Sequence, residues 1–380
     1  MARILIVGDA HSPLIRERGL IGRRAGHEVF WMSPAGGVVG DVRVFSPPAA
    51  IHRMRAIRQL ALPFVLRRAL TEVRPDLIHV HYAYQALGTY VLRRFHPLVV
   101  SVMGGDILPD QSYHGYRAQL VRSLLDAADC ITSKSEFLDA ALGAIGPYHE
   151  KIRRITWGVD LNHYSRMRDT SRLRRRLGIR DDEYVFFDAR LAEALYNKDV
   201  ILAAFAAYLE TGRHAVLIVS ELFGHVDFLA QLRQRARDLG IVDRVRFVGG
   251  IDPREMADYY ALADVTISVP ASDGFPQTIY EAAASGSFLI LSDLPQYREA
   301  VRDGLVAHHV RPGDPTALAA ALIWFANHPE ARVEATRAAW TYTSKVADKR
   351  MQDVELCDLY AELLQRRQPR FTGGKTLTPG

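Results

Sequence analysis

The sequence predicts an α/β protein with two doubly wound parallel-sheet domains that face each other across a cleft. Short β-branched apolar runs alternate with longer helical patterns, which is typical of parallel sheets covered by helices on both faces. The alternation occurs twice along the 380 residues, a length greater than one hydrophobic core usually supports. Because such sheets bind ligands beyond the carboxyl ends of their strands, a site in the cleft is expected.

The composition is that of a soluble globular protein, with 48% hydrophobic and 24% charged residues and a net charge of +5. This charge is compatible with a nucleotide ligand or an anionic surface, and the lack of a recognition motif disfavours nucleic-acid binding. Cys130 and Cys357 have no metal-ligand spacing, so a reducing, cytoplasmic compartment is expected. The sequence contains no uninterrupted run of about 18 apolar residues, so no membrane span is expected.

The first domain is expected over residues 1–160. Its N-terminal apolar run is predicted to be a strand, because no signal-peptide cleavage pattern follows it. The predicted strands are Arg3 to Val7, Glu28 to Met32, Leu77 to Val80, Leu98 to Val102 and Ile131 to Ser133. Helices are predicted at Ala83 to Phe95 and Tyr116 to Ala128.

The second domain is expected over residues 161–340, after a crossing near Trp157 to Ser165. The predicted strands are Tyr184 to Asp188, Ala215 to Val219, Val245 to Val248, Val265 to Val269 and Phe288 to Leu291. The predicted helices are Val200 to Leu209, Val226 to Leu239, Pro253 to Ala263 and Thr316 to Asn327.

The end of the chain differs from both domains. Trp340 to Gln365 has the amphipathic pattern of one long helix, and we expect residues 341–366 to cross back and pack on the first domain. Residues 367–380 are rich in Gly, Pro and Thr, a composition that predicts disorder.

One loop and helix in the second half carry the chemistry of a phosphate site. A predicted strand is followed by Asp273 and Gly274, and a helix begins at Gln277 or Thr278. The free N–H groups and positive end of a helix are a seat for a pyrophosphate. Glu281, one turn into the helix, can accept hydrogen bonds from a ribose diol, and Asp273 from sugar hydroxyls.

This segment, DGFPQTIYEAAASG, resembles the acidic-x7-Glu signature of the family-4 retaining glycosyltransferases, whose GT-B fold has two Rossmann-like domains. The resemblance implies that Asp273 contacts the donor sugar and Glu281 the ribose. It also implies that the donor is bound by Gly274, Phe275, Gln277 and Thr278. The family more usually has Glu where this chain has Asp273, which bears on the identity of the sugar. The alternative is an ordinary loop–helix junction with acids near the positive helix end.

A second match lies at the end of the first strand of the second half. Arg190 and Leu191 follow Asp188, and Lys198 comes eight residues after Arg190. They resemble the Arg-Leu and Lys of the family, which implies that both cations grip the donor diphosphate and stabilise the departing negative charge. The spacing is longer than the common pattern, and the alternative is a surface salt bridge. A third match, the segment RFVGGI, implies that Gly249 lies beside the nucleotide base.

The first half departs further from the family. The position of the family's His after the fourth strand holds Met103, so no catalytic His is carried over. Asp106 follows, and it is a candidate contact for sugar hydroxyls or the acceptor, or else a loop acid or helix cap. His79 and His81 share one face of a strand, and a structural role is favoured over a metal pair because no third ligand is evident.

The segment Ile51 to Arg74 interleaves arginines with apolar residues. The favoured interpretation is a core-packing helix pair, broken at Pro63, with a solvated basic face. The alternative is peripheral contact with an anionic membrane at its inner face, where lipid acceptors reside.

The function predicted from these features is transfer of a sugar, with retention, from a UDP- or GDP-linked nucleotide-sugar to a hydroxyl acceptor. The acceptor is a glycan, a lipid-linked group or a small molecule. Without an Asp-x-Asp motif we expect no metal, and no cofactor beyond the donor substrate. The alternatives are a sugar-nucleotide epimerase on the same scaffold and a catalytically silent sugar-nucleotide-binding subunit. The oligomeric state is not indicated.

Overall fold

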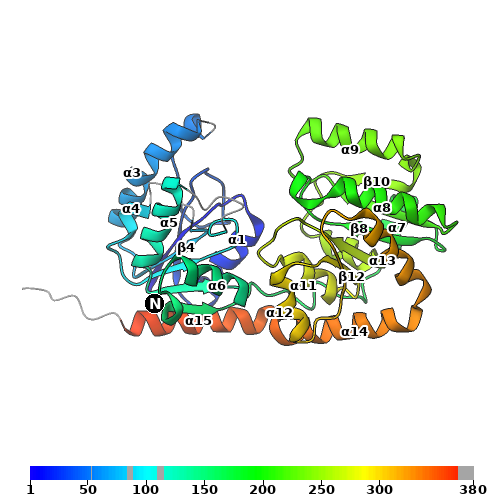
Figure 1. Ribbon diagram of the computed structural model, residues 1–380. Helices are drawn as coiled ribbons and strands as arrows, with labels where there is room; N and C mark the ends of the chain where they lie inside the picture. Colours follow the sequence, from blue (N-terminus) through cyan, green and yellow to red (C-terminus); the bar gives the residue numbers. More distant parts are fainter. Residues whose placement is uncertain (53, 84–88, 109–114, 367–380) are drawn as a thin grey trace, which may run out of the picture.

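The computed structural model describes residues 1–52, 54–83, 89–108 and 115–366, and it contains two parallel sheets, each at the centre of one domain (Figure 1). Every strand pair within the two sheets is parallel. The predicted fold class of two doubly wound domains is therefore confirmed.

The first sheet has seven strands in the order β3-β2-β1-β4-β5-β6-β7. The five predicted strands are present within one residue of their expected bounds, and two short edge strands, β3 and β7, were not predicted. The strands are β1 (Arg3–Val7), β2 (Glu28–Met32), β3 (Val44–Phe45), β4 (Leu77–His81), β5 (Leu98–Ser101), β6 (Cys130–Ser133) and β7 (Ile152–Arg154).

The helices of the first domain are α1 (Pro13–Gly19), α2 (Ile21–Arg24), α3 (Arg55–Val73), α4 (Thr89–Leu92), α5 (Gly115–Ala127) and α6 (Glu136–Ile145). The expected break at Pro63 is wrong, because α3 continues through that residue. Leu62 and Leu66 on its inner face are buried in the domain core, and this packing outweighs the cost of proline inside a helix. Residues 84–88 of the helix expected before Phe95 lie outside the described residues.

The second sheet has six strands in the order β10-β9-β8-β11-β12-β13, with β13 at an edge that the sequence did not indicate. The strands are β8 (Tyr184–Asp188), β9 (Ala215–Ser220), β10 (Val245–Val248), β11 (Val265–Ser268), β12 (Phe288–Ser292) and β13 (His308–Val310). The helices are α7 (Ser171–Arg176), α8 (Lys198–Glu210), α9 (Val226–Asp238), α10 (Met256–Leu262), α11 (Gln277–Ala284), α12 (Pro295–Arg302) and α13 (Pro315–Asn327).

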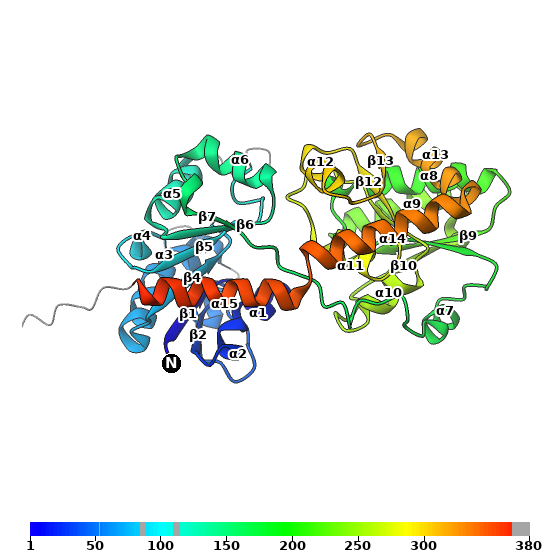
Figure 2. The same cartoon turned by 90° about the horizontal axis from the view of Figure 1, so that it is seen from below.

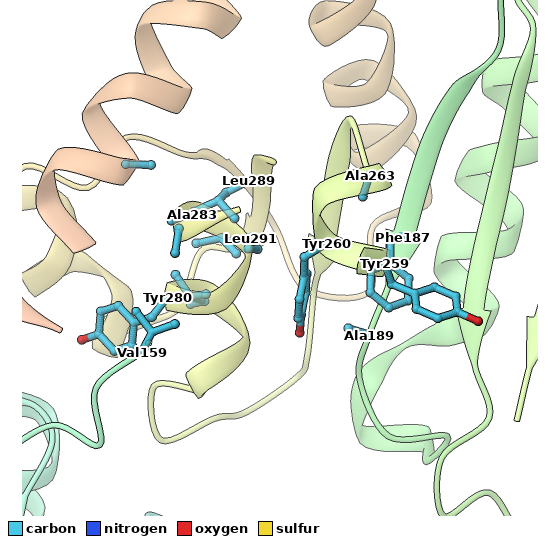
Figure 3. Packing of buried hydrophobic residues seen from close by; sticks show 14 of the residues in the cluster. Val159, Phe187, Ala189, Tyr259, Tyr260, Ala263, Tyr280, Ala283, Leu289 and Leu291 are labelled. Carbon is cyan, nitrogen blue, oxygen red and sulfur yellow. The ribbon is translucent and has the colours of Figure 1, made fainter. Parts of the chain in front are cut away.

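A buried cluster of aromatic and aliphatic residues includes the inner face of α11. Phe187 of β8 contacts Tyr260 of α10, with ring centroids 5.4 Å apart. Figure 3 shows Tyr259 and Tyr260 reaching into this cluster from α10, and Tyr280 from α11. Since these side chains are at least 95% buried, α11 is held in a fixed position against β11 and β12 of the second sheet.

The last two helices span both domains. α14 (Pro329–Val346) packs on α11 in the second domain, and α15 (Lys349–Gln365) packs on the first (Figures 1 and 2). The buried face of α15 packs in one core cluster with residues of β1 and β2 of the first domain, which confirms the predicted crossing back. Its buried residues in that core are Leu356, Leu359, Tyr360 and Leu363.

The single helix expected from Trp340 to Gln365 is corrected to two helices that meet at Ala347 and Asp348. Asp348 caps α15 by accepting a hydrogen bond from the backbone N–H of Arg350. The outgoing chain meets the returning chain here, because the N–H of Val159 donates to the carbonyl of Ala347 at 2.6 Å. These contacts from a distant segment end α14, although the amphipathic pattern continues. The predicted disordered tail, residues 367–380, lies outside the described residues.

Among the helices that the structure describes, none is both long and apolar enough to cross a membrane.

Candidate active site

A pocket of about 660 Å³ lies between the two domains. Its first-domain wall comes from α1 and the residues before it, and its second-domain wall comes from the β9–α9 loop, the segment after β10 and α11. These are the carboxyl ends of the strands, where doubly wound sheets bind ligands. The lining includes His11, Glu17, Trp157, Phe223, Ile251 and Glu281.

The loop between β11 and α11 touches the first domain at Gly274. A Cβ atom on Gly274 would lie 2.7 Å from the carbonyl oxygen of Met103 and 3.1 Å from Cα of Gly104. These distances are too short for any side chain, so glycine is required for the two domains to approach here. Phe275 follows with a φ of 67°, and its buried ring packs edge-on against Tyr297. The loop is thus fixed from both sides.

Arg190 lies at the end of β8 and forms an ion pair with Asp273, with 2.7 Å between Nη2 and Oδ2. Both side chains are about nine-tenths buried. The guanidinium also stacks over Tyr196, 4.5 Å from its ring centroid. Within the described residues, Nη1 of Arg190 has no hydrogen-bond partner. A buried unpaired donor is costly, and Arg190 is not among the residues that line the pocket.

Lys198 begins α8, and its ammonium is paired with Asp188 at the end of β8. Neither side chain has exposed surface. The other carboxylate oxygen of Asp188 accepts the backbone N–H of Arg190 at 3.1 Å. The pair fixes the end of β8. That Lys198 grips the diphosphate stays a prediction.

Glu281 faces the pocket from the second turn of α11. Burial raises the pKa of its carboxyl to about 7, while hydrogen bonds from Tyr260 and Tyr164 and the charge of Arg190 act in the opposite direction. Two hydroxyl donors therefore aim this carboxylate at the pocket, as the predicted ribose contact requires.

The other predicted donor residues lie on two elements. Thr278 and Gln277 line the pocket at the start of α11, and the side-chain amide of Gln277 donates to the carbonyl of Gly158 in the crossing segment. Gly249 is exposed at the end of β10, but the pocket wall there is formed by Ile251.

Asp106 has no exposed surface. Its carboxylate accepts backbone N–H groups of Ala83 at 2.8 Å, Gly104 at 2.9 Å and Met103 at 3.0 Å. Burial raises the pKa of Asp106, and these bonds lower it. The structure therefore places Asp106 as the acid that shapes the loop facing Gly274, which was the alternative to a sugar contact.

His79 and His81 are fully buried and stacked, with ring centroids 4.0 Å apart. His79 bonds Tyr360 of α15 at 2.6 Å and Ser101 of β5 at 2.7 Å. Burial lowers the pKa of both rings, that of His81 to about 3, so both are neutral. In the described residues no group of three side chains is placed to hold a metal. The pair thus has the structural environment that was favoured.

Comparison with known families matches both halves of the chain. The family model "Glycosyl transferases group 1" matches residues 169–341, and "Glycosyltransferase Family 4" matches residues 22–163. The chain belongs to the family-4 glycosyltransferases. The resemblance inferred from the segment between Asp273 and Glu281 is confirmed, and so is the assignment as a sugar-transferring enzyme.

Two curated family-4 relatives and one solved structure illustrate the similarity. D-inositol 3-phosphate glycosyltransferase 2 of Catenulispora acidiphila is 29% identical over 71% of this chain and 68% of its own length. Alpha-monoglucosyldiacylglycerol synthase of Streptococcus pneumoniae is 32% identical over 48% of this chain and 42% of its own length. Anabaena HepE in complex with UDP and glucose has the same fold, with a TM-score of 0.78 at 19% identity over 96% of this chain and all of HepE.

Two polar residues of this family-4 site were missed by sequence analysis. Tyr164 bonds Glu281 from the crossing segment, and Lys134 follows β6 in the first domain. The ammonium of Lys134 lies 3.4 Å from the carbonyl oxygen of Phe275. Burial lowers its pKa, and the nearby carboxylate of Asp273 raises it. Lys134 could have been found from its position directly after a predicted strand, because the carboxyl ends of parallel strands face the ligand.

Proposed function

We propose that this glycosyltransferase transfers a sugar, with retention of configuration, from a UDP- or GDP-linked donor to a hydroxyl acceptor. The observation that carries the proposal is the unpaired Nη1 of the buried Arg190, beside the loop that leads into α11. A fixed cation and a helix N-terminus together suit a diphosphate leaving group. Glu281, on the same helix, supplies the acceptor atoms for a ribose diol.

In the proposed reaction, the bond from the anomeric carbon to the diphosphate oxygen breaks and the acceptor oxygen bonds to that carbon on the same face. The acceptor proton passes to the departing phosphate oxygen. Arg190 and the α11 end stabilise the charge that develops on the diphosphate. Asp273, held on Arg190 and hydrogen-bonded by Tyr297 at 3.3 Å, orients the sugar.

The donor experiment measures release of nucleoside diphosphate from UDP- and GDP-sugars, with and without acceptor and with EDTA. Release that is stimulated by acceptor and unaffected by EDTA supports metal-independent transfer. NMR of the product assigns the anomeric configuration, and an inverted product would overturn the retaining assignment. Isomerised nucleotide-sugar would indicate the epimerase alternative, and tight binding without either product would indicate a silent subunit; no observation of the site favours either.

The acceptor side of the proposal follows the names of two relatives, one acting on D-inositol 3-phosphate and one named as a glucosyldiacylglycerol synthase. Both names imply that the attacking hydroxyl group belongs to an anionic or lipid-linked acceptor. Lys134, in the first domain and close to Asp273, is the cation that we propose attracts such an anion. An acceptor panel that pairs phosphorylated and unphosphorylated polyols tests this, since Lys134→Gln should reduce only the preference for phosphate.

We propose further that the protein is cytoplasmic and contacts the inner face of an anionic membrane through α3. Ile57, Leu60 and Phe64 are 44%, 63% and 70% exposed on one stripe of this helix, and exposed Arg67 and Arg68 follow them. Such a stripe suits the interface between headgroups and acyl chains.

Sedimentation with vesicles tests the membrane contact. The protein should bind vesicles that contain anionic lipid in preference to neutral ones, and the change of Leu60 and Phe64 to Ser should abolish binding. Met167→Ser, at a residue 92% exposed outside this stripe, is the matched control. Equal binding by both variants would refute the contact through α3.

A further inference from the structure

Phe223 is a large aromatic side chain that the rest of the fold leaves uncovered. It lies in the loop between β9 and α9, it is 79% exposed, and it lines the interdomain pocket. Its φ of 58° is in the left-handed region, which a bulky residue rarely adopts. A side chain that gains little burial and holds a strained backbone is a candidate for ligand contact.

The loop presents Phe223 rigidly. The carbonyl of the preceding Leu222 accepts the N–H of Ala192 at 3.0 Å. On the other side, the N–H of Gly224 donates to the carbonyl of Glu221 at 3.0 Å, and a Cβ on Gly224 would lie 2.5 Å from the side chain of Leu229. Both neighbours are therefore fixed, and the backbone at Phe223 is held at the pocket wall.

The chemistry of the surrounding wall indicates what the ring meets. Besides Phe223, the second-domain wall of the pocket includes the apolar residues Leu222, Ile251, Pro253 and Met256, together with the charged Arg254. The polar groups proposed for the donor, Glu281 and Thr278, line the same pocket. With the diphosphate at Arg190 and the ribose at Glu281, the base is the remaining part of the donor, and it is the flat, apolar-faced part.

We propose that Phe223 is the platform on which the donor base stacks, and that it contributes to the choice of base. The inference rests on the proposed function. Removal of an aromatic ring on which a base stacks weakens the binding affinity about 5- to 150-fold. Since Phe223 and Glu281 belong to one domain, the platform and the ribose site keep their relative positions when the domains move.

The experiment measures dissociation constants of UDP, GDP and ribose 5-phosphate by calorimetry or competition. Phe223→Ala should weaken the binding of UDP and GDP about 5- to 150-fold and leave the binding of base-free ribose 5-phosphate unchanged. Phe223→Trp should retain or strengthen binding. Val226→Ala is the matched control, since Val226 is 77% exposed at the start of α9 and does not line the pocket.

Phe223→Gly separates ligand contact from a structural role. Glycine adopts positive φ without strain, so this variant should raise Tm by about 2 °C while it weakens UDP and GDP as Phe223→Ala does. A lower Tm with unchanged nucleotide affinity would overturn the proposal. Equal affinities of wild type and Phe223→Ala for UDP and GDP would also overturn it, whereas a wild type that binds no nucleoside diphosphate would instead refute the proposed function.

Discussion

The guanidinium of Arg190 and the carboxylate of Asp273, 83 residues apart in sequence, form a nearly buried ion pair that joins the end of β8 to the loop before α11. Arg190→Lys keeps the positive charge but loses the planar fork that bonds Asp273 and a diphosphate together. We expect kcat to fall about 100-fold, as for loss of one group that stabilises the developing charge. Steady-state kinetics check this, with the exposed Arg311→Lys as control; full activity would exclude Arg190 from the leaving-group site.

Lys198 and Asp188 form a pair with no exposed side-chain surface, so removing one partner leaves an uncompensated buried charge. Lys198→Met should lower the free energy of unfolding by about 3–5 kcal/mol, and adding Asp188→Leu should restore much of it. Urea denaturation measures both. Activity should stay low in the double variant, because Asp188 also holds the backbone N–H of Arg190. If Lys198→Met instead keeps full stability and loses only nucleotide affinity, Lys198 binds the diphosphate directly, as the sequence motif predicted.

The stability of the folded protein should depend on pH through the carboxyl group of Glu281. Its pKa of about 7 in the folded protein is above the value of 4.5 expected when unfolded, so its contribution to stability is complete below pH 4.5 and is lost as pH rises through 7. The side chain of Gln does not titrate in this pH range, so Glu281→Gln should be more stable than wild type at pH 8.5, by on the order of 2 kcal/mol, and about equal at pH 5. Thermal unfolding at the two pH values checks the sign.

Glu281→Gln should also weaken UDP binding at pH 8.5, because an amide replaces one of the two carboxylate acceptors for the ribose diol. A constant difference in Tm across this pH range would contradict the raised pKa. Unchanged UDP affinity would contradict the ribose contact.

The sequence predicted most of the fold because apolar runs mark strands that are buried on both faces. β1, β2, β8 and β10 have the predicted bounds, whereas β3, β7 and β13 are short edge strands stabilised by one neighbouring strand and carry no such run. The break at Ala347 could not be predicted, because the sequence has a helical pattern on both sides of it. Its cause is a hydrogen bond to Val159, which lies far away in the sequence.

The candidate site divides in the same way. Asp273 and Glu281 were found together because one loop and one helix turn carry both. Tyr164 and Lys134 reach this group from other segments, so only tertiary structure shows their contacts. For Lys198 the residue type suggested a ligand, and only the structure shows that its ammonium is paired with Asp188 in the core.

Gly274 tests whether the two domains must meet for catalysis. Gly274→Ala would place a methyl group 2.7 Å from the Met103 carbonyl oxygen, which only separation of the domains relieves. We expect kcat/KM to fall at least about 10-fold, with little change in Tm because each domain core is untouched, and the radius of gyration from solution scattering to increase. In contrast, Gly143→Ala in α6 has no atom within 4 Å of the new methyl group and should stabilise the helix by about 0.5–1 kcal/mol without affecting activity. Wild-type kinetics together with an unchanged radius of gyration in Gly274→Ala would show that this contact is not needed for the reaction.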